Sequence, residues 1–300
     1  MADRSDITGG TFVSAADSDP DGRTHEALRL VRDFIYEQTG NWFEDGALYL
    51  LRRRLASRLP ALALPDFHEY QRVLRASPES IRKAELDEIA DRVTTNETYF
   101  FRERSQLDSF SEHLLPRLAH ERARSRRLGI WSAGCSSGEE VYTIAMLILE
   151  SGLFTGWDVR VFGSDISRKA LRTARTAEYG PGSFRVTDEA RIERWFDVVD
   201  GKHRVKYEVR DLCRFGQINL VDSDATSVLG TFDVAFCRNV LIYFDAESRK
   251  RVISTLERKL HPGGYLLLGH SESLAALAAE LELVHLPNDL VYRRPPVRHT

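Results

Sequence analysis

The sequence predicts an α/β protein in which a small N-terminal all-helical domain precedes a doubly wound, mostly parallel sheet with an inserted small antiparallel β-subdomain. Large apolar residues recur at helix spacing from residue 25 to about 127. From Leu128 onward, short apolar runs alternate with amphipathic segments, the pattern of a parallel sheet covered on both faces. A charged tract at about 180–214 interrupts this alternation, so we place the insertion there.

The predicted domains follow these changes in the sequence. Residues 1–24 are small and polar and are predicted to be a disordered tail. Residues 25–110 are predicted to be the helical domain with its linker, and residues 111–300 the sheet domain. The chain has 300 residues, of which 42% are hydrophobic, so it can build two modest cores.

The helical domain is predicted from apolar stripes at helical spacing, separated by Pro60 and Pro65. The stripes consist of Leu30, Phe34 and Ile35, then Leu48, Leu51 and Leu55, then Tyr70, Val73 and Leu74.

The sheet domain is predicted from apolar runs that fit buried strands. These runs cover residues 128–133, 159–164, 232–237 and 265–269, with a further strand near Val291. A helix is expected over 245–260, because Asp245 is a good N-cap and a Pro-Gly-Gly run follows its end.

The insertion contains one recognisable pattern. Charged and apolar residues alternate over 202–210, the pattern of a small antiparallel strand with one solvent-exposed face. Long insertions in compact folds are often functional, and a charged strand edge can dock an extended peptide. A solvated hairpin without a binding role explains the pattern as well.

A run of small residues after the first strand predicts a ligand cradle. Residues 133–138, including Gly134, expose backbone N–H groups where a helix begins. Asp165 lies at the end of the second strand, where a carboxylate can accept hydrogen bonds from both hydroxyls of a ribose. Glu139 and Glu140 occupy the first helical turn, where they would repel the pyrophosphate of a dinucleotide. Two acids suit a cationic nucleoside such as S-adenosylmethionine, although they could instead complement the helix dipole alone.

Charge and cysteine content narrow the class of protein. The net charge of −3 predicts no bulk attraction to nucleic acid or to an anionic membrane. The three cysteines are odd in number and far apart, which indicates reduced thiols rather than disulfides or a zinc site. No signal peptide or membrane-spanning run is evident, so we expect a cytoplasmic protein without direct membrane insertion or a bound metal.

Six short motifs together resemble one family, the CheR-type chemotaxis methyltransferases, which methylate glutamate side chains of transmembrane chemoreceptors with S-adenosylmethionine. The motifs are TTNETYFFRE at 94–103, WSAGCSSGEE at 131–140, SDI at 164–166, INL at 218–220, FCRNVLIYF at 236–244 and GHSES at 269–273. The resemblance extends into the helical part through IYEQTGNWF at 35–43 and covers about residues 26–294. It implies a Rossmann-like methyltransferase sheet and receptor contacts by the β-subdomain.

The resemblance also implies roles for individual residues. Arg102 and Tyr243 match the pair that orients the substrate carboxylate, and are the catalytic candidates. The cofactor candidates are Asn96, Thr98, Arg102, Gly134, Glu139, Glu140, Asp165, Asn219, Leu220, Asn239 and Val240. Sequence alone does not decide between the two glutamates. The cofactor would be S-adenosylmethionine, with S-adenosylhomocysteine as product.

The implied partner is the cytoplasmic domain of a methyl-accepting chemotaxis receptor, bound by a monomeric enzyme. Arg52, Arg53, Arg54 and Arg58 could dock on an acidic receptor helix bundle, or could form a solvated face with ion pairs. Two departures from familiar members are Val141, where a proline often follows the two glutamates, and a missing upstream lysine. Two alternatives stay open: the same chemistry on a non-chemotaxis signalling protein, or a non-catalytic module that binds S-adenosylmethionine.

Overall fold

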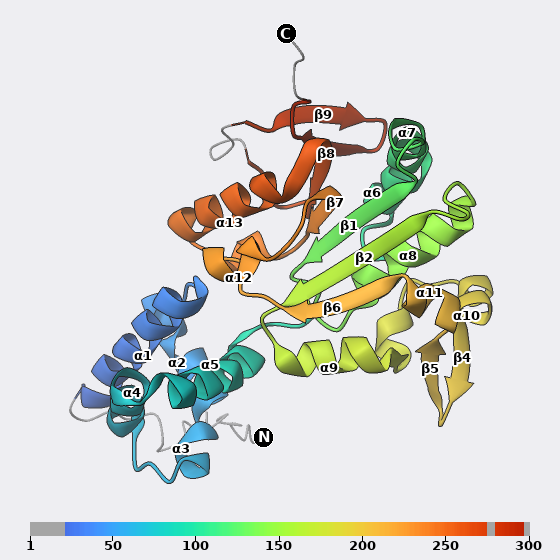
Figure 1. The fold of residues 1–300 in the computed structure, drawn as a ribbon. Coiled ribbons are helices and arrows are strands. Elements are labelled where there is room, and N and C mark those ends of the chain that lie inside the picture. Colours follow the sequence, from blue (N-terminus) through green and yellow to red (C-terminus); the bar gives the residue numbers. More distant parts are fainter. Residues whose placement is uncertain (1–21, 275–279, 297–300) are drawn as a thin grey trace, which may run out of the picture.

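The computed structural model describes residues 22–274 and 280–296. These residues form an N-terminal helical region, a seven-stranded sheet with helices on both faces, and a separate three-stranded sheet (Figure 1). The predicted tail falls largely outside the described residues, and the first helix already begins at Arg23. No helix within the described ranges is long and apolar enough to cross a membrane.

The helical region has its own buried core. Its elements are α1 (Arg23–Thr39), η2 (Asp45–Ala47), α2 (Leu48–Leu55), α3 (Arg58–Ala61), α4 (Phe67–Ala76) and α5 (Glu79–Val93). The three predicted stripes supply much of this core, including Phe34, Leu51 and Leu74. Arg58 is not available for docking, because it forms a two-pronged ion pair with buried Glu85.

The large sheet has the strand order β6-β2-β1-β7-β8-β10-β9. Its strands are β1 (Arg127–Ala133), β2 (Asp158–Asp165), β6 (Cys213–Gln217), β7 (Phe232–Cys237), β8 (Leu260–Leu268), β9 (Glu282–Leu286) and β10 (Asp289–Arg293). β6, β2, β1, β7 and β8 pair in parallel, whereas β10 pairs antiparallel with β8 and β9. The predicted doubly wound sheet is therefore confirmed.

Alternate residues of the central strand face opposite layers. On β1, Leu128 and Ile130 belong to one hydrophobic cluster, while Trp131 and Ala133 belong to the other. This period of two is what a sheet buried on both faces requires. The helices around the sheet are α6 (Arg104–Ser109), η3 (Phe110–Leu114), α7 (Leu115–Glu121), α8 (Glu139–Ser151), α9 (Arg168–Thr176), α12 (Ser223–Ser227), η5 (Leu241–Tyr243) and α13 (Ala246–Lys259).

The expected insertion forms the small sheet, in the order β3-β5-β4. Its elements are β3 (Glu178–Tyr179), η4 (Pro181–Phe184), α10 (Glu189–Trp195), β4 (Phe196–Val199), β5 (Lys202–Val205) and α11 (Tyr207–Asp211). The strand predicted over 202–210 is wrong in its second half, which is helical. Val205 and Val209 are both fully buried, and their spacing of four residues also fits one turn of helix.

The segment between the helical and sheet regions packs with the sheet. Phe100, Leu107 and Phe110 are buried in the same cluster as Ile130, and Phe110 contacts Phe236 edge-on at 5.2 Å. The domain limits 25–110 and 111–300 stay a prediction.

The helical region contacts the sheet region through α5 and through the end of α1. α5 lies beside α9, as Figure 1 shows. After α1, Asn41 forms an antiparallel bridge with Phe244, and the Trp42 N–H donates to the Tyr243 carbonyl at 3.0 Å. The helical region therefore adjoins the carboxyl ends of the parallel strands, where ligands of such sheets bind.

Candidate functional site

A cavity of about 420 Å³ lies between the helical region and the ends of β1, β2 and β7. Its volume is within the range of small-molecule sites. Both regions supply its walls. The predicted residues that line it are Asn96, Thr98, Arg102, Gly134, Glu140, Asp165, Asn219, Leu220, Asn239, Val240 and Tyr243. The structure thus brings together every candidate except Glu139.

The loop after β1 makes the close approach that its small residues predict. Gly134 has a φ of +80°, and its N–H donates to the Ser164 carbonyl at 2.7 Å. A Cβ at Gly134 would lie 2.4 Å from a Val240 methyl group. Only glycine therefore allows the β1 loop and the segment after β7 to meet at the cavity.

Asp165 is held by two backbone groups at the end of β2. Its Oδ2 accepts from the Ser136 N–H and its Oδ1 from the Ser167 N–H, both at 2.8 Å. Burial raises the pKa of the Asp165 carboxyl above its ordinary value, and these backbone donors oppose the rise. Each oxygen retains a lone pair, so the carboxylate can also accept ligand hydroxyls.

The two glutamates of the first turn of α8 point to different places. Glu139 is buried away from the cavity and accepts from the Ser137 and Ser183 hydroxyls at 2.7 and 2.9 Å. Because Ser183 belongs to the insertion, Glu139 links the loop to the β-subdomain. Glu140 lines the cavity and accepts from the Ser132 hydroxyl at 2.7 Å.

Arg238, which the sequence did not single out, is the buried cation of the site. It is 7% exposed and contacts Glu140 at 3.1 Å and Glu103 at 3.0 Å. Its Nη2 also donates to the Arg102 carbonyl at 2.6 Å. Burial acts to raise the pKa of the Glu103 carboxyl, but the charge and hydrogen bond of Arg238, together with smaller contributions from His270 and Asn239, lower it below its ordinary value. A charged residue that directly follows a buried strand was the available signal.

The segment that carries Arg102 has an unusual backbone. Phe101 and Glu103, on either side, have φ values of +58° and +57°. Left-handed conformations of such residues cost on the order of 1 kcal/mol or more each, so surrounding contacts must hold them. The Thr143 hydroxyl accepts a hydrogen bond from the Phe101 N–H at 3.1 Å, and Arg238 donates to the Arg102 carbonyl. The Arg102 guanidinium donates to the Glu97 carbonyl at 2.9 Å and lies over the Tyr99 ring.

Tyr243 is at the exposed rim of the cavity. Tyr243 is 37% exposed to solvent, and its hydroxyl makes no hydrogen bond within the described part of the chain. The loop before it is held by Glu272 of the GHSES motif. That carboxylate accepts from the Asn239 N–H at 2.8 Å and from the Ile242 N–H at 3.3 Å. Asn239 itself has a φ of +58°, a conformation that asparagine tolerates.

The amides of the other candidates already have protein partners. Asn219 donates to the Gln38 carbonyl at 2.6 Å and accepts from the Val221 N–H. Asn96 donates to the Thr94 hydroxyl and accepts from the Ser136 hydroxyl. Asn219 therefore joins the helical region to the cavity wall, and Leu220 supplies the apolar surface beside it.

This set of side chains fits S-adenosylmethionine. A buried carboxylate with free lone pairs suits the ribose, and the acidic Glu140 suits a cationic ligand. Apolar groups for a purine come from Ile218, Leu220 and Val240. In the described residues, no three His, Cys, Asp or Glu side chains are grouped to hold a metal ion.

Comparison with known proteins identifies the family of this chain. The chain matches the family model "CheR methyltransferase, SAM binding domain" over residues 96–289, and "CheR methyltransferase, all-alpha domain" over residues 26–94. It is 38% identical over 271 residues to a chemotaxis protein methyltransferase of Vibrio parahaemolyticus, covering 87% of this chain and 94% of that protein. Chemotaxis protein methyltransferase 2 of Vibrio cholerae is 34% identical over 273 residues, covering 88% and 91% of the two chains. The chemotaxis protein methyltransferase of Salmonella typhimurium is 35% identical over 263 residues, covering 85% and 86%. Since both its helical and its sheet region match, the chain belongs to the CheR methyltransferase family.

Proposed function

We propose that this methyltransferase transfers a methyl group from S-adenosylmethionine to glutamate side chains of methyl-accepting chemotaxis receptors, giving glutamyl methyl esters. The observation that carries the proposal is that Arg102 and Tyr243 both line the cofactor cavity. A guanidinium and an unpartnered phenol at an exposed rim are donors suited to a carboxylate. The names of the relatives, chemotaxis protein methyltransferases, support the choice of receptor.

The acceptor group needs little activation. A glutamate side chain has a reference pKa near 4.3, so it is already an anionic nucleophile at neutral pH and needs no general base. When bound, S-adenosylmethionine supplies an activated methyl group through its sulfonium charge. The protein's contribution is placement, which can account for several kcal/mol of a barrier.

We assign the residues of the cavity to distinct tasks. Arg102 would hold the acceptor carboxylate with the guanidinium nitrogens that Glu97 leaves free, and Tyr243 would add a second donor. Asp165 would accept the ribose hydroxyls. Glu140 rather than Glu139 would face the positive end of the cofactor, since only Glu140 lines the cavity. Cofactor contacts by Asn96, Thr98, Gly134, Asn219, Leu220, Asn239 and Val240 are proposed on the same ground.

The exposed rim suits a protein substrate better than a small molecule. Trp42 and Ile242 line the cavity and are both more than two-fifths exposed. Arg53 lies on α2, and is exposed to solvent. We propose that the cytoplasmic domain of the receptor presents its glutamates here to a cytoplasmic, monomeric enzyme.

The test is methyl transfer to a purified receptor cytoplasmic domain. The protein is incubated with S-adenosylmethionine labelled in its methyl group, and label released as methanol by mild base is counted. A glutamyl methyl ester is base-labile, so release is expected from the receptor and not from a variant with its acceptor glutamates changed to alanine. Label that is stable to base, or equal in both receptors, would overturn the glutamate assignment.

A further inference from the structure

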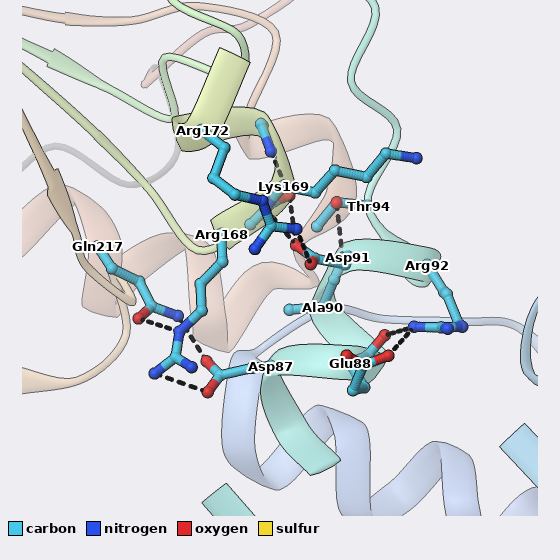
Figure 2. A network of polar contacts seen from close by, with 12 residues as sticks. Asp87, Glu88, Ala90, Asp91, Arg92, Thr94, Arg168, Lys169, Arg172 and Gln217 are labelled. Atoms are coloured by element: carbon cyan, nitrogen blue, oxygen red, sulfur yellow. Dashed lines mark hydrogen bonds and ion pairs between the residues drawn. The ribbon is translucent and has the colours of Figure 1, made fainter. Parts of the chain in front are cut away.

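A row of acids on α5 meets the beginning of α9. Asp91 Oδ1 accepts from the Ser167 hydroxyl at 2.7 Å and from the Lys169 backbone N–H at 2.9 Å. Figure 2 shows Asp91 directed at the start of α9, with Arg172 approaching its other oxygen. An acid from a different domain thus satisfies a backbone donor in the first turn of this helix.

Ser167 is the connection from this contact to the cavity. It is fully buried, and it donates to two carboxylates at once. Its hydroxyl donates to Asp91, while its backbone N–H donates to Asp165 Oδ1 at 2.8 Å. The same hydroxyl oxygen accepts from the Ala170 N–H at 3.1 Å as the N-cap of α9. The orientation of Ser167 is therefore fixed by three hydrogen bonds, two of which go to carboxylates, and Asp91 supplies the carboxylate that the hydroxyl contacts.

We propose that Asp91 is a positioning residue for the cofactor site: through Ser167 it fixes the Asp165 carboxylate, so that the helical domain raises cofactor affinity at a distance. Asp91 does not line the cavity, so it acts through other groups and not by touching the ligand. The proposal rests on the assignment of Asp165 to the ribose. It adds that the cofactor site is complete only when Asp91 of α5 contacts Ser167.

Without Asp91, the Ser167 hydroxyl would lose its acceptor in a buried place. A buried donor without a partner is unfavourable, so the Ser167 hydroxyl would turn toward another acceptor. Its backbone N–H and the Asp165 carboxylate would then lose their fixed geometry. A hydrogen bond to a charged group is sensitive to such a change.

Asp87 provides a matched control on the same helix face. It lies one turn earlier on α5, and it also ties α5 to α9, through an ion pair with Arg168 at 2.8 Å (Figure 2). Its other partner is the Gln217 side chain at 2.6 Å. Because Asp87 does not contact Ser167, it reports domain docking without the hydrogen bonds that run through Ser167.

The experiment is calorimetric titration of the full chain with S-adenosylhomocysteine. The variants are Asp91→Ala, Asp91→Asn, Asp87→Ala and Asp165→Ala. We expect Asp91→Ala to weaken binding about tenfold, the loss of one charged hydrogen bond. Asp91→Asn keeps an acceptor oxygen and should restore most of the affinity. Asp87→Ala should change the affinity less than about twofold, since no bond to Asp165 depends on it. At saturating S-adenosylmethionine, kcat of Asp91→Ala should stay near the wild-type value while KM for the cofactor rises.

Each outcome decides a separate point. Equal weakening by Asp91→Ala and Asp87→Ala, or no weakening by Asp91→Ala, would overturn the positioning role. If Asp165→Ala leaves the affinity unchanged, the ribose assignment itself fails, whatever Asp91 does. If Asp91→Ala does not fold, Ser167→Ala breaks the same link from the sheet side. Wild-type affinity in folded Ser167→Ala would then count against the proposal.

Discussion

The inner wall and the rim of the cofactor cavity are built in opposite ways. At the inner wall, both oxygens of Asp165 and both oxygens of Glu140 have protein partners. At the rim, Tyr243 is partly exposed to solvent, and one nitrogen of the Arg102 guanidinium donates to a backbone carbonyl. The inner wall therefore fixes a small ligand in one orientation, whereas the rim keeps donors available for a group that arrives on another protein.

This difference has a physical basis. Preorganised donors and acceptors bind tightly because little reorganisation accompanies binding. A macromolecular substrate must also leave after each transfer, so uniform tight binding at the rim would not raise kcat. Loss of a residue should accordingly change cofactor affinity at the inner wall and turnover at the rim.

Arg102→Ala should give the largest effect. We expect kcat to fall between about 100- and 1,000-fold, the range for removal of a charged donor from a reacting group. Affinity for S-adenosylhomocysteine should change little, as calorimetry would show. Arg185→Ala is the matched control, because Arg185 also lies over the Tyr99 ring but does not line the cavity. An equal collapse of cofactor affinity in Arg102→Ala would place that residue on the inner wall.

Asp165→Ala should lower cofactor affinity, in contrast to the effect of Arg102→Ala on turnover. Loss of a carboxylate that accepts two hydroxyls should weaken S-adenosylhomocysteine binding about 50-fold. The control is Asp158→Ala, at the exposed opposite end of the same strand. Unchanged cofactor affinity, measured by titration of both variants, would remove Asp165 from the ribose.

Tyr243→Phe should give a smaller loss. Removing one neutral hydroxyl at a solvent-exposed position should lower kcat about fivefold, with cofactor affinity unaltered. Steady-state kinetics with the receptor domain as varied substrate would separate kcat from KM. An unchanged kcat would leave Arg102 as the sole holder of the acceptor carboxylate.

The smallest effect concerns acid stability at Glu103. Because Arg238 lowers the folded-state pKa of this carboxyl, its ionised form stabilises the fold above the ordinary glutamate pKa near 4.3. This contribution is lost as pH falls from there through the lowered folded-state pKa. Urea unfolding from pH 6 to pH 3 should show a shallower loss for Glu103→Gln than for wild type. The exposed Glu79→Gln serves as control, and an identical profile for Glu103→Gln would contradict the assignment.

Sequence reasoning predicted the elements that one local pattern specifies. The strand at β1, the small-residue loop at Gly134 and the acid at Asp165 each follow from residues near one another in the chain. The small antiparallel sheet was predicted, but Val205 and Val209 fit a strand and a helix alike, and only packing decided between them. The separation of Glu139 from Glu140 also depended on distant partners, Ser183 for one and Arg238 for the other.

The residues that reasoning missed act across domains. Arg238 holds the Arg102 carbonyl, and Asp91 holds Ser167, through contacts between segments far apart in the sequence. A single sequence does not say which residues form such pairs, although the place of Arg238 directly after a buried strand is a signal for that residue alone. Glu272 was within a recognised motif, yet its bonds to the Asn239 loop follow only from the fold.

The bridge between Asn41 and Phe244 affects the order in which parts of the molecule fold. Beside it, Tyr36 donates to Asp245, a residue 209 positions later in the chain. Contacts of such long range form late in folding, because their loop-closure entropy is repaid only once both partners are in place. During synthesis the helical domain emerges first and must await more than half the chain before its partner exists. The rim that carries Tyr243 is thus assembled near the end of folding, and an unfinished enzyme has no assembled rim at which to receive a substrate.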